Sequence, residues 1–130
     1  MTPRTHSRIS SSVRWRDVGA VGVGGTIGTA LRLGIDVLVV HTDATFPVST
    51  LVVNTVGAFC LGLIVAGLWP VVPTWARAGL GVGLLGSFTT FSAVAGSLLL
   101  LAHNDQWMLA AAYLAATLVL GLGAAALGLR

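Results

Sequence analysis

Four apolar stretches, each long enough to cross a lipid bilayer, make up most of this sequence. They cover residues 18–40, 48–69, 77–102 and 107–129. A helix rises about 1.5 Å per residue, so roughly 20 residues cross the ~30 Å hydrocarbon core of a membrane. Lipid offers the backbone no hydrogen bonds, and a spanning segment must satisfy its own peptide groups as a helix. The sequence predicts an all-α membrane protein with four transmembrane helices.

The composition leaves little chain outside the membrane. Only 8% of the 130 residues are charged and 55% are hydrophobic, which excludes a soluble or disordered protein. Residues 1–17 form a polar, Arg-rich tail like the start of a signal peptide, but the apolar stretch behind it has 23 residues, against about 7–15 in a signal peptide. We expect a retained first helix, one domain over residues 18–130, and no enzyme, because no nucleophile–base pair is found.

Prolines and tryptophans mark where the spans end. Pro47 suits the first turn of a helix, where its missing N–H has no partner to lose. Pro70 and Pro73 cannot continue an intrahelical hydrogen-bond ladder, so they stop the second span. The indole rings expected at the headgroup level belong to Trp69, Trp75 and Trp107. The short loops predict that successive helices run antiparallel.

The distribution of arginine predicts how the chain sits in the membrane. The net charge is +3 without any lysine, and Arg4, Arg8, Arg14 and Arg16 lie in the tail. This is not the basic face with stacking aromatics that binds nucleic acid. Across the four spans, six arginines fall on one side and none in the loops 41–46 and 103–106 on the other. Basic residues favour the cytoplasmic side, so we expect both termini there, in the plasma (inner) membrane.

The third span combines poor helix formers with hydroxyl groups. It contains Gly79, Gly81, Gly83 and Gly86, followed by Ser87, Thr89, Thr90 and Ser92. Each glycine costs a helix about 1 kcal/mol relative to alanine. We therefore predict an interrupted helix that unwinds near residues 86–90. Residues 81–86 also match the dinucleotide-binding pattern G-x-G-x-x-G, but the strand and soluble βαβ unit that give this pattern its meaning are missing.

Four motifs together resemble the Fluc (CrcB) fluoride channels, over residues 18–129. They are residues 25–32 (GTIGTALR), 54–59 (NTVGAF) and 86–92 (GSFTTFS), and the pair Tyr113 and Thr117. The resemblance implies a fluoride-selective channel that exports fluoride passively. It also implies an antiparallel dimer of two oppositely oriented subunits, with two pores and a central structural sodium ion.

The resemblance also implies roles for individual residues. Gly86 and Thr89 would hold the sodium ion through backbone carbonyls. For Arg32, its place near the far end of the first span leads us to expect a vestibule or structural role. The residues expected along the fluoride pore are Asn54, Phe91, Thr50, Thr90, Ser92, Tyr113 and Thr117.

The side-chain chemistry suits these roles, and each has a plainer alternative. Asn54 offers two N–H donors to an anion, or it makes an ordinary interhelical hydrogen bond. Phe91 has a positive ring edge, or it only fills space. The hydroxyl of Thr50, one turn before Asn54, extends the polar line or bonds its own helix. Gly86 either frees a carbonyl for a cation or is a packing kink. Arg32 reaches the interface or a vestibule, and Asp36 is placed to pair with it.

The chain also departs from the family pattern. Val94 stands where a second pore phenylalanine is usual, Gly121 where another hydroxyl is usual, and Leu33 replaces a frequent aromatic. These differences leave one rival, a non-conducting scaffold subunit of a heteromeric channel. A second rival is a small proton-coupled multidrug exporter, which has similar length, span number and dimeric build. The exporter needs an intramembrane carboxylate, for which Asp36 is the one candidate. It is open whether both pores conduct.

The uneven arginine distribution bears on the partner. A single sequence that inserts in both directions needs nearly balanced charge. We therefore expect the partner to be a related, separately encoded chain inserted the other way, with a homodimer as the alternative.

Overall fold

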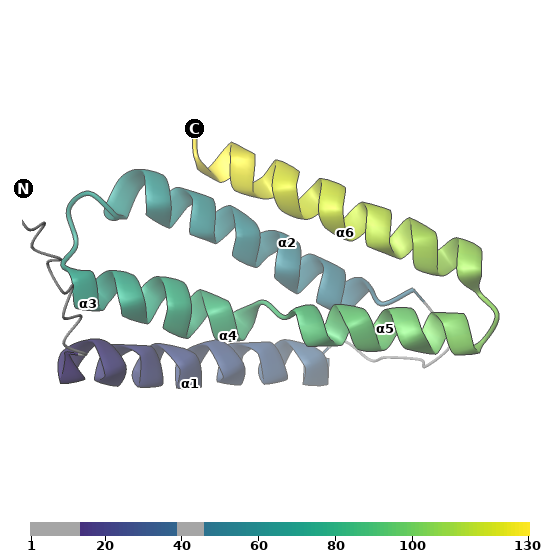
Figure 1. The fold of residues 1–130 in the computed structure, drawn as a ribbon, viewed down its shortest axis with the longest axis horizontal. Coiled ribbons are helices and arrows are strands. Elements are labelled where there is room, and N and C mark those ends of the chain that lie inside the picture. Colours follow the sequence, from purple (N-terminus) through teal and green to yellow (C-terminus); the bar gives the residue numbers. More distant parts are fainter. Residues whose placement is uncertain (1–13, 39–45) are drawn as a thin grey trace, which may run out of the picture.

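The computed structural model describes residues 14–38 and 46–130, and every regular element in them is a helix (Figure 1). Four helical spans are long and apolar enough to cross a membrane, which confirms the predicted number. The first two are α1 (Trp15–Leu38) and α2 (Val48–Leu63), the latter continued by the wide π turns of η1 (Ile64–Leu68). The third consists of α3 (Thr74–Arg77), η2 (Ala78–Leu85), α4 (Gly86–Phe88) and α5 (Phe91–His103), and the fourth is α6 (Trp107–Gly128).

The span boundaries agree with the prediction to within three residues. The helix α1 begins at Trp15 rather than at residue 18. The first turn of α1 contains Asp17. A negative charge is favourable at the positive end of a helix dipole, which helps the last polar residues of the tail to be helical. The third span begins at Thr74, three residues earlier than predicted, because Pro73 acts as the N-cap of α3. Most of the predicted loop 41–46 lies outside the described residues.

Glycine lets α1 approach the third span closely. A side chain on Gly28 would overlap the carbonyl of Leu84, and one on Gly24 would overlap that of Gly79. From the other side, a Cβ on Gly83 would lie 2.7 Å from the carbonyl oxygen of Val21. The four-residue spacing of these glycines places them on one helix face, as in small-residue contacts between membrane helices. The same device joins α2 to α6, where Gly62 and Gly128 face each other's backbone.

The helices that pack most closely are not successive in the chain. Successive spans run antiparallel, as predicted, but α1 packs mainly on the third span and α2 on α6. Both of these pairs run parallel, which Figure 1 shows through the colour gradient. The small buried core lies between α5 and α6 and consists of Val94, Leu101, Ala110 and Tyr113. Most other apolar side chains are left on the outer surface, where lipid or another subunit can cover them.

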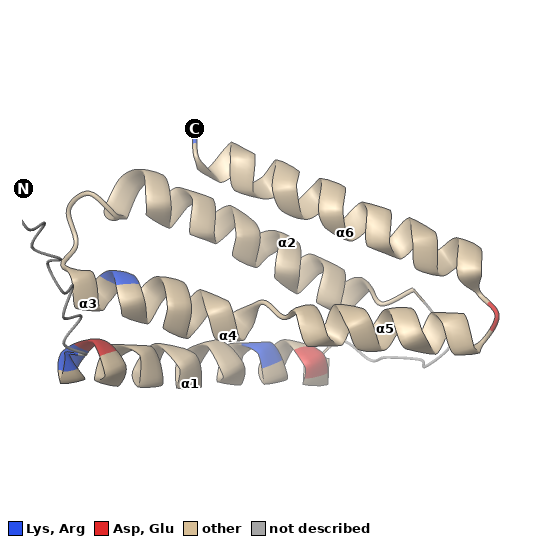
Figure 2. Cartoon of the chain, viewed as in Figure 1, with Lys and Arg blue, Asp and Glu red and all other residues tan. Residues whose placement is uncertain are grey.

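Basic residues gather at one end of the bundle. Figure 2 shows basic positions at the start of α1, at the end of α3 and just beyond α6, with acidic positions in the first turn of α1 and, at the opposite end, in the turn between α5 and α6. A further basic and acidic pair lies in the second half of α1. That pair is Arg32 and Asp36, whose Nε and Oδ2 atoms are 3.7 Å apart, as their spacing predicted. The ends of the described bundle therefore differ in charge.

Candidate functional site

The third span is interrupted at Thr89 and Thr90. Thr89 has φ −84° and ψ 150°, and Thr90 has φ −150° and ψ 130°, so both are extended. The predicted interruption is confirmed, but its predicted extent is wrong, because residues 86–88 are still helical. Gly86 has φ −65° and ψ −28°, values that any residue adopts in a helix. Glycine weakens the helix here, and the position of the break is determined by contacts from other spans.

Asn54 of α2 pairs with the peptide of Thr90 through both ends of its amide. The Thr90 N–H donates to Asn54 Oδ1 at 2.9 Å, and Asn54 Nδ2 donates to the Thr90 carbonyl at 3.1 Å. In an uninterrupted helix, the Thr90 N–H would bond to the Gly86 carbonyl four residues earlier. Asn54 thus replaces a helical hydrogen bond and leaves the Gly86 carbonyl without that donor. One N–H of the Asn54 amide is not used in this pairing.

Arg32 of α1 reaches the other side of the break. Its Nη1 donates to the Phe88 carbonyl at 3.3 Å, in a partly buried position. Phe88 is the last helical residue before the break, so its carbonyl has lost its intrahelical partner. A cation at the carboxyl end of a helix also opposes the negative end of the helix dipole. Of the two roles considered for Arg32, in a vestibule or in holding the structure, this contact supports the structural one.

The carboxyl end of α4, which precedes the break, is here called the carbonyl side. It presents backbone oxygens of the kind that bind hard cations. The N–H and the hydroxyl of Thr89 both donate to the Leu85 carbonyl, at 2.9 Å and 2.8 Å. The Gly86 carbonyl has lost its helical N–H donor to Asn54. The carbonyl oxygens of Ser87 and Thr89 also lie at the break. Sodium and similar ions take oxygen ligands of this kind. The described residues contain no group of three or more His, Cys, Asp or Glu side chains that would offer a different donor set.

The amino end of α5, which follows the break, presents hydrogen-bond donors and one exposed aromatic ring. Thr90 is the N-cap of α5, and its hydroxyl accepts a hydrogen bond from the Ala93 N–H at 3.4 Å. The hydroxyls of Thr90 and Ser92 are 2.8 Å apart. The Phe91 ring is 80% exposed and points away from the chain's own interior. Any anion that meets its edge must therefore lie on the outer surface of this subunit.

A second polar group surrounds Tyr113, which is 0% exposed. Its ring meets that of Phe46 edge to face, with the centroids 5.4 Å apart. Among the described residues its hydroxyl has no hydrogen-bond partner at ordinary distance, but the hydroxyls of Thr50, Ser97 and Thr117 lie close enough to interact with it. A buried hydroxyl without a partner costs about 1–3 kcal/mol. The group is therefore chemically suited to a small polar guest. Thr117 donates to the Tyr113 carbonyl at 2.8 Å, within its own helix.

Helix α2 connects the two groups, because Thr50 and Asn54 are one turn apart on the same face. The structure thus brings together most of the predicted pore residues. Ser92 contacts Thr90 from the exposed surface, and Phe91 points outward. Sequence reasoning missed Ser97, although a hydroxyl in the middle of a span is the signal that identified Ser92. Val94 is only 2% exposed and belongs to the core around Tyr113.

Comparisons with known proteins agree with this arrangement. A family profile described as CrcB-like protein, Camphor Resistance (CrcB), matches residues 19–129. A relative from Halalkalibacterium halodurans named fluoride-specific ion channel FluC 2 is 41% identical over 115 residues, 87% of this chain and 83% of that protein. FluC 1 of Mycobacterium tuberculosis is 36% identical over 110 residues, 83% of each chain. FluC of Shewanella amazonensis is 39% identical over 111 residues, 83% of this chain and 89% of that one.

None of these names supports a scaffold or a multidrug exporter. The match covers all four spans, including both sides of the break. With its multi-pass helical fold, the chain belongs to the CrcB family.

Proposed function

We propose that this chain is one subunit of a fluoride-selective channel, which lets fluoride leave the cell passively. The observation that carries the proposal is the break at Thr89 and Thr90, whose peptide groups are held by Asn54 and Arg32. Irregular backbone at membrane depth is tolerated only where protein or a polar cavity satisfies it. The names of the relatives identify the ion. The liposome flux measurement described below distinguishes this channel from a scaffold subunit and from an exporter.

The two helix ends at the break attract charges of opposite sign. The carboxyl end of α4 carries partial negative charge, and the amino end of α5 carries partial positive charge. Fluoride is small and strongly hydrated, so a pore must replace the donors of its water shell. The unused Asn54 N–H, the α5 amino end and the hydroxyls of Thr50 and Tyr113 would supply such donors, and Thr50 lies one turn before Asn54 on α2. The exposed Phe91 edge would face the ion from the outer surface.

The carbonyl end of the break would hold the structural sodium ion, through Gly86 and Thr89. A hard cation binds about six or more oxygen atoms, more than these two residues provide. Because Gly86 is exposed on the subunit surface, a second subunit is the natural source of the others. Bound there, sodium would supply positive charge that fixes both carbonyl ends. This proposal requires a dimer of oppositely oriented subunits.

Flux measurements on liposomes test the function directly. Liposomes that contain this chain together with an oppositely inserted relative should release fluoride faster than protein-free liposomes, while chloride release should stay at background. Liposomes that contain this chain alone are measured beside them. A non-conducting scaffold would give no release alone, and release in the presence of the relative would not change when pore residues of this chain are substituted. An exporter would give flux that depends on a proton gradient.

Substitutions at Gly86 and Thr89 separate the sodium site from the fold of one subunit. A Cβ on Gly86 would lie 3.6 Å from the Gly81 carbonyl oxygen, an ordinary van der Waals distance. We therefore expect Gly86→Leu to fold but to lose dimer assembly and flux, because the added side chain covers the carbonyl side of the break. Thr89→Ser keeps the hydroxyl bond to Leu85 and should behave as wild type.

Light scattering in detergent measures the assembly, and liposome efflux measures the flux. Gly96→Leu is the matched control, since nothing lies within 4 Å of a Cβ at Gly96. Normal assembly and flux of Gly86→Leu would rule out an ion site packed between subunits at this position.

The orientation follows from the charge at the bundle ends. We expect both termini in the cytoplasm and a partner that is a related, separately encoded subunit inserted the other way. The reason is the arginine count, six on one side and none in the opposite loops. Cysteine labelling of single-cysteine variants, with membrane-impermeant reagents in intact cells, checks the orientation. A large population with external termini, or strong flux from this chain purified alone, would establish the homodimer.

A further inference from the structure

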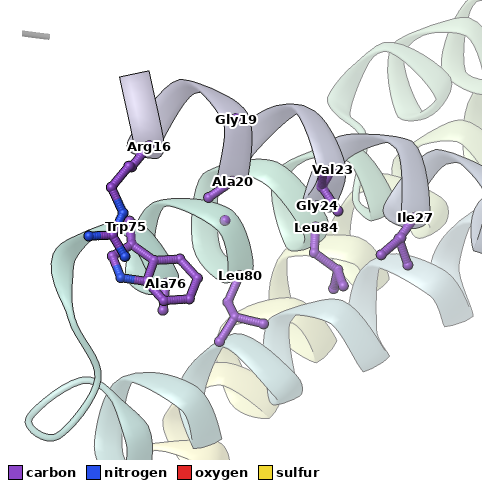
Figure 3. Close-up of a pocket in the computed structure, with 11 residues that line it drawn as sticks. Arg16, Gly19, Ala20, Val23, Gly24, Ile27, Trp75, Ala76, Leu80 and Leu84 are labelled. Carbon is purple, nitrogen blue, oxygen red and sulfur yellow. The ribbon is translucent and has the colours of Figure 1, made fainter. Parts of the chain in front are cut away.

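An apolar groove runs along the outside of α1 and the first half of the third span. Its volume is about 630 Å³, within the range of small-molecule sites. One charged residue, Arg16, lines it, together with Trp75, and the remaining lining residues are glycine, alanine or aliphatic. Figure 3 shows Arg16 and Trp75 at one end and Val23, Ile27 and Leu84 at the other. The groove lies away from Asn54 and Tyr113, and the proposed channel function does not use it.

The groove has the depth of one membrane leaflet. It follows α1 from Arg16 to Ile27, eleven residue steps, or about 16 Å at 1.5 Å per residue. This is about half of the ~30 Å hydrocarbon core. Trp75 lies beside its mouth, where an indole prefers the headgroup region. An acyl chain that enters at the headgroup level would fill the groove to the bilayer midplane.

The mouth of the groove is positively charged. The Arg16 guanidinium lies over the Trp75 ring, 5.6 Å from its centroid, which orients it while its N–H donors stay available. Arg14 is exposed near the same end, and α3 ends with Arg77. The Arg77 side chain is itself bonded to the Val72 carbonyl, so Arg16 is the better headgroup ligand. A guanidinium fork matches a phosphate group bidentately.

We propose that this groove binds one anionic membrane phospholipid, with an acyl chain between α1 and η2 and its phosphate on Arg16. Charge complementarity selects the anionic lipid over a neutral one. A second protein copy fits less well. In the same orientation it would bring its own arginines to this mouth, and in the opposite orientation it would leave the mouth without a negative phosphate.

The test uses the purified full-length chain in detergent, with phosphatidylglycerol or phosphatidylcholine added. Native mass spectrometry should show one retained phosphatidylglycerol per chain, in preference to phosphatidylcholine. Arg16→Gln should lower the retained phosphatidylglycerol about fivefold and remove the preference, because one basic contact is lost. Gly19→Phe should remove both lipids, since a side chain there enters the groove and no atom of the described residues lies within 4 Å of its Cβ.

Two matched variants complete the design. Arg14→Gln removes an exposed charge that does not line the groove, and Gly22→Phe adds the same ring at a glycine that is equally open and outside it. Both should retain phosphatidylglycerol as the wild type does. Equal retention of the two lipids by the wild type, or undiminished retention by Gly19→Phe, would overturn the proposal. Dissociation of an oligomer by Gly19→Phe, with lipid retention unchanged, would identify the groove as a subunit interface instead.

Discussion

Asn54→Ala should lower fluoride flux by about a hundredfold or more, the largest functional effect we expect from a single substitution. The change removes two hydrogen bonds to the Thr90 peptide and the amide donor that faces the proposed path. Each partly buried peptide group left without a partner costs about 1–3 kcal/mol. The break would then rearrange, and the anion would lose a donor at the same point. Fluoride efflux from liposomes, with chloride efflux beside it, measures the effect.

Asn54→Asp separates the structural part of this effect from the ionic part. An aspartate keeps an oxygen for the Thr90 N–H but loses the N–H donor and adds a negative charge. We expect a folded protein with little flux, because the charge repels an anion. Val52→Ala, a change at a half-exposed position on the same helix, is the control and should conduct normally. Wild-type flux in Asn54→Ala would mean that the amide only packs between helices.

Gly28→Leu should prevent α1 from packing on the third span, the largest effect on the fold that we expect. A Cβ at Gly28 overlaps the Leu84 carbonyl and lies 3.1 Å from the Phe88 nitrogen, and both are backbone atoms that cannot rotate away. Overpacking of this kind typically costs about 1–3 kcal/mol, and more when backbone must move. The displacement would also draw Arg32 away from the Phe88 carbonyl.

Thermal unfolding in detergent and the yield of monodisperse protein measure this loss. Gly22→Leu, on the same helix with nothing within 4 Å of its Cβ, should unfold at the wild-type temperature. If Gly28→Leu were as stable as Gly22→Leu, the close approach of the two spans would not be a source of stability.

Hydropathy and residue spacing predicted the number of spans and their ends, because both depend on local sequence. The break was predicted from glycines and hydroxyls, yet its position depends on Asn54, 36 residues away from Thr90. A local pattern shows where a helix is weak, but it does not show which peptide another span will bind. Gly86 therefore looked like part of the break, although its backbone is helical.

Helix pairing was predictable only in part. The short loops indicated antiparallel neighbours, and this holds along the chain. The parallel pairing of α1 with η2 depends on glycines spaced four apart in both segments, Gly24 and Gly28 against Gly79 and Gly83. This match is visible in the sequence once the two segments are compared. The full burial of Tyr113 depends on Phe46, which precedes α2, and on Val94 of α5, and has no local signal.

The residues that hold the break are synthesised before the break itself. Arg32 and Asn54 belong to the first and second spans, and both precede Thr89 and Thr90 in the chain. A ribosome makes the chain from its amino end, so both side chains exist before the third span emerges. The exposed peptide groups of that span thus meet ready-made partners during insertion. A circular permutant that begins at the third span would have to enter the membrane with these groups still unpaired.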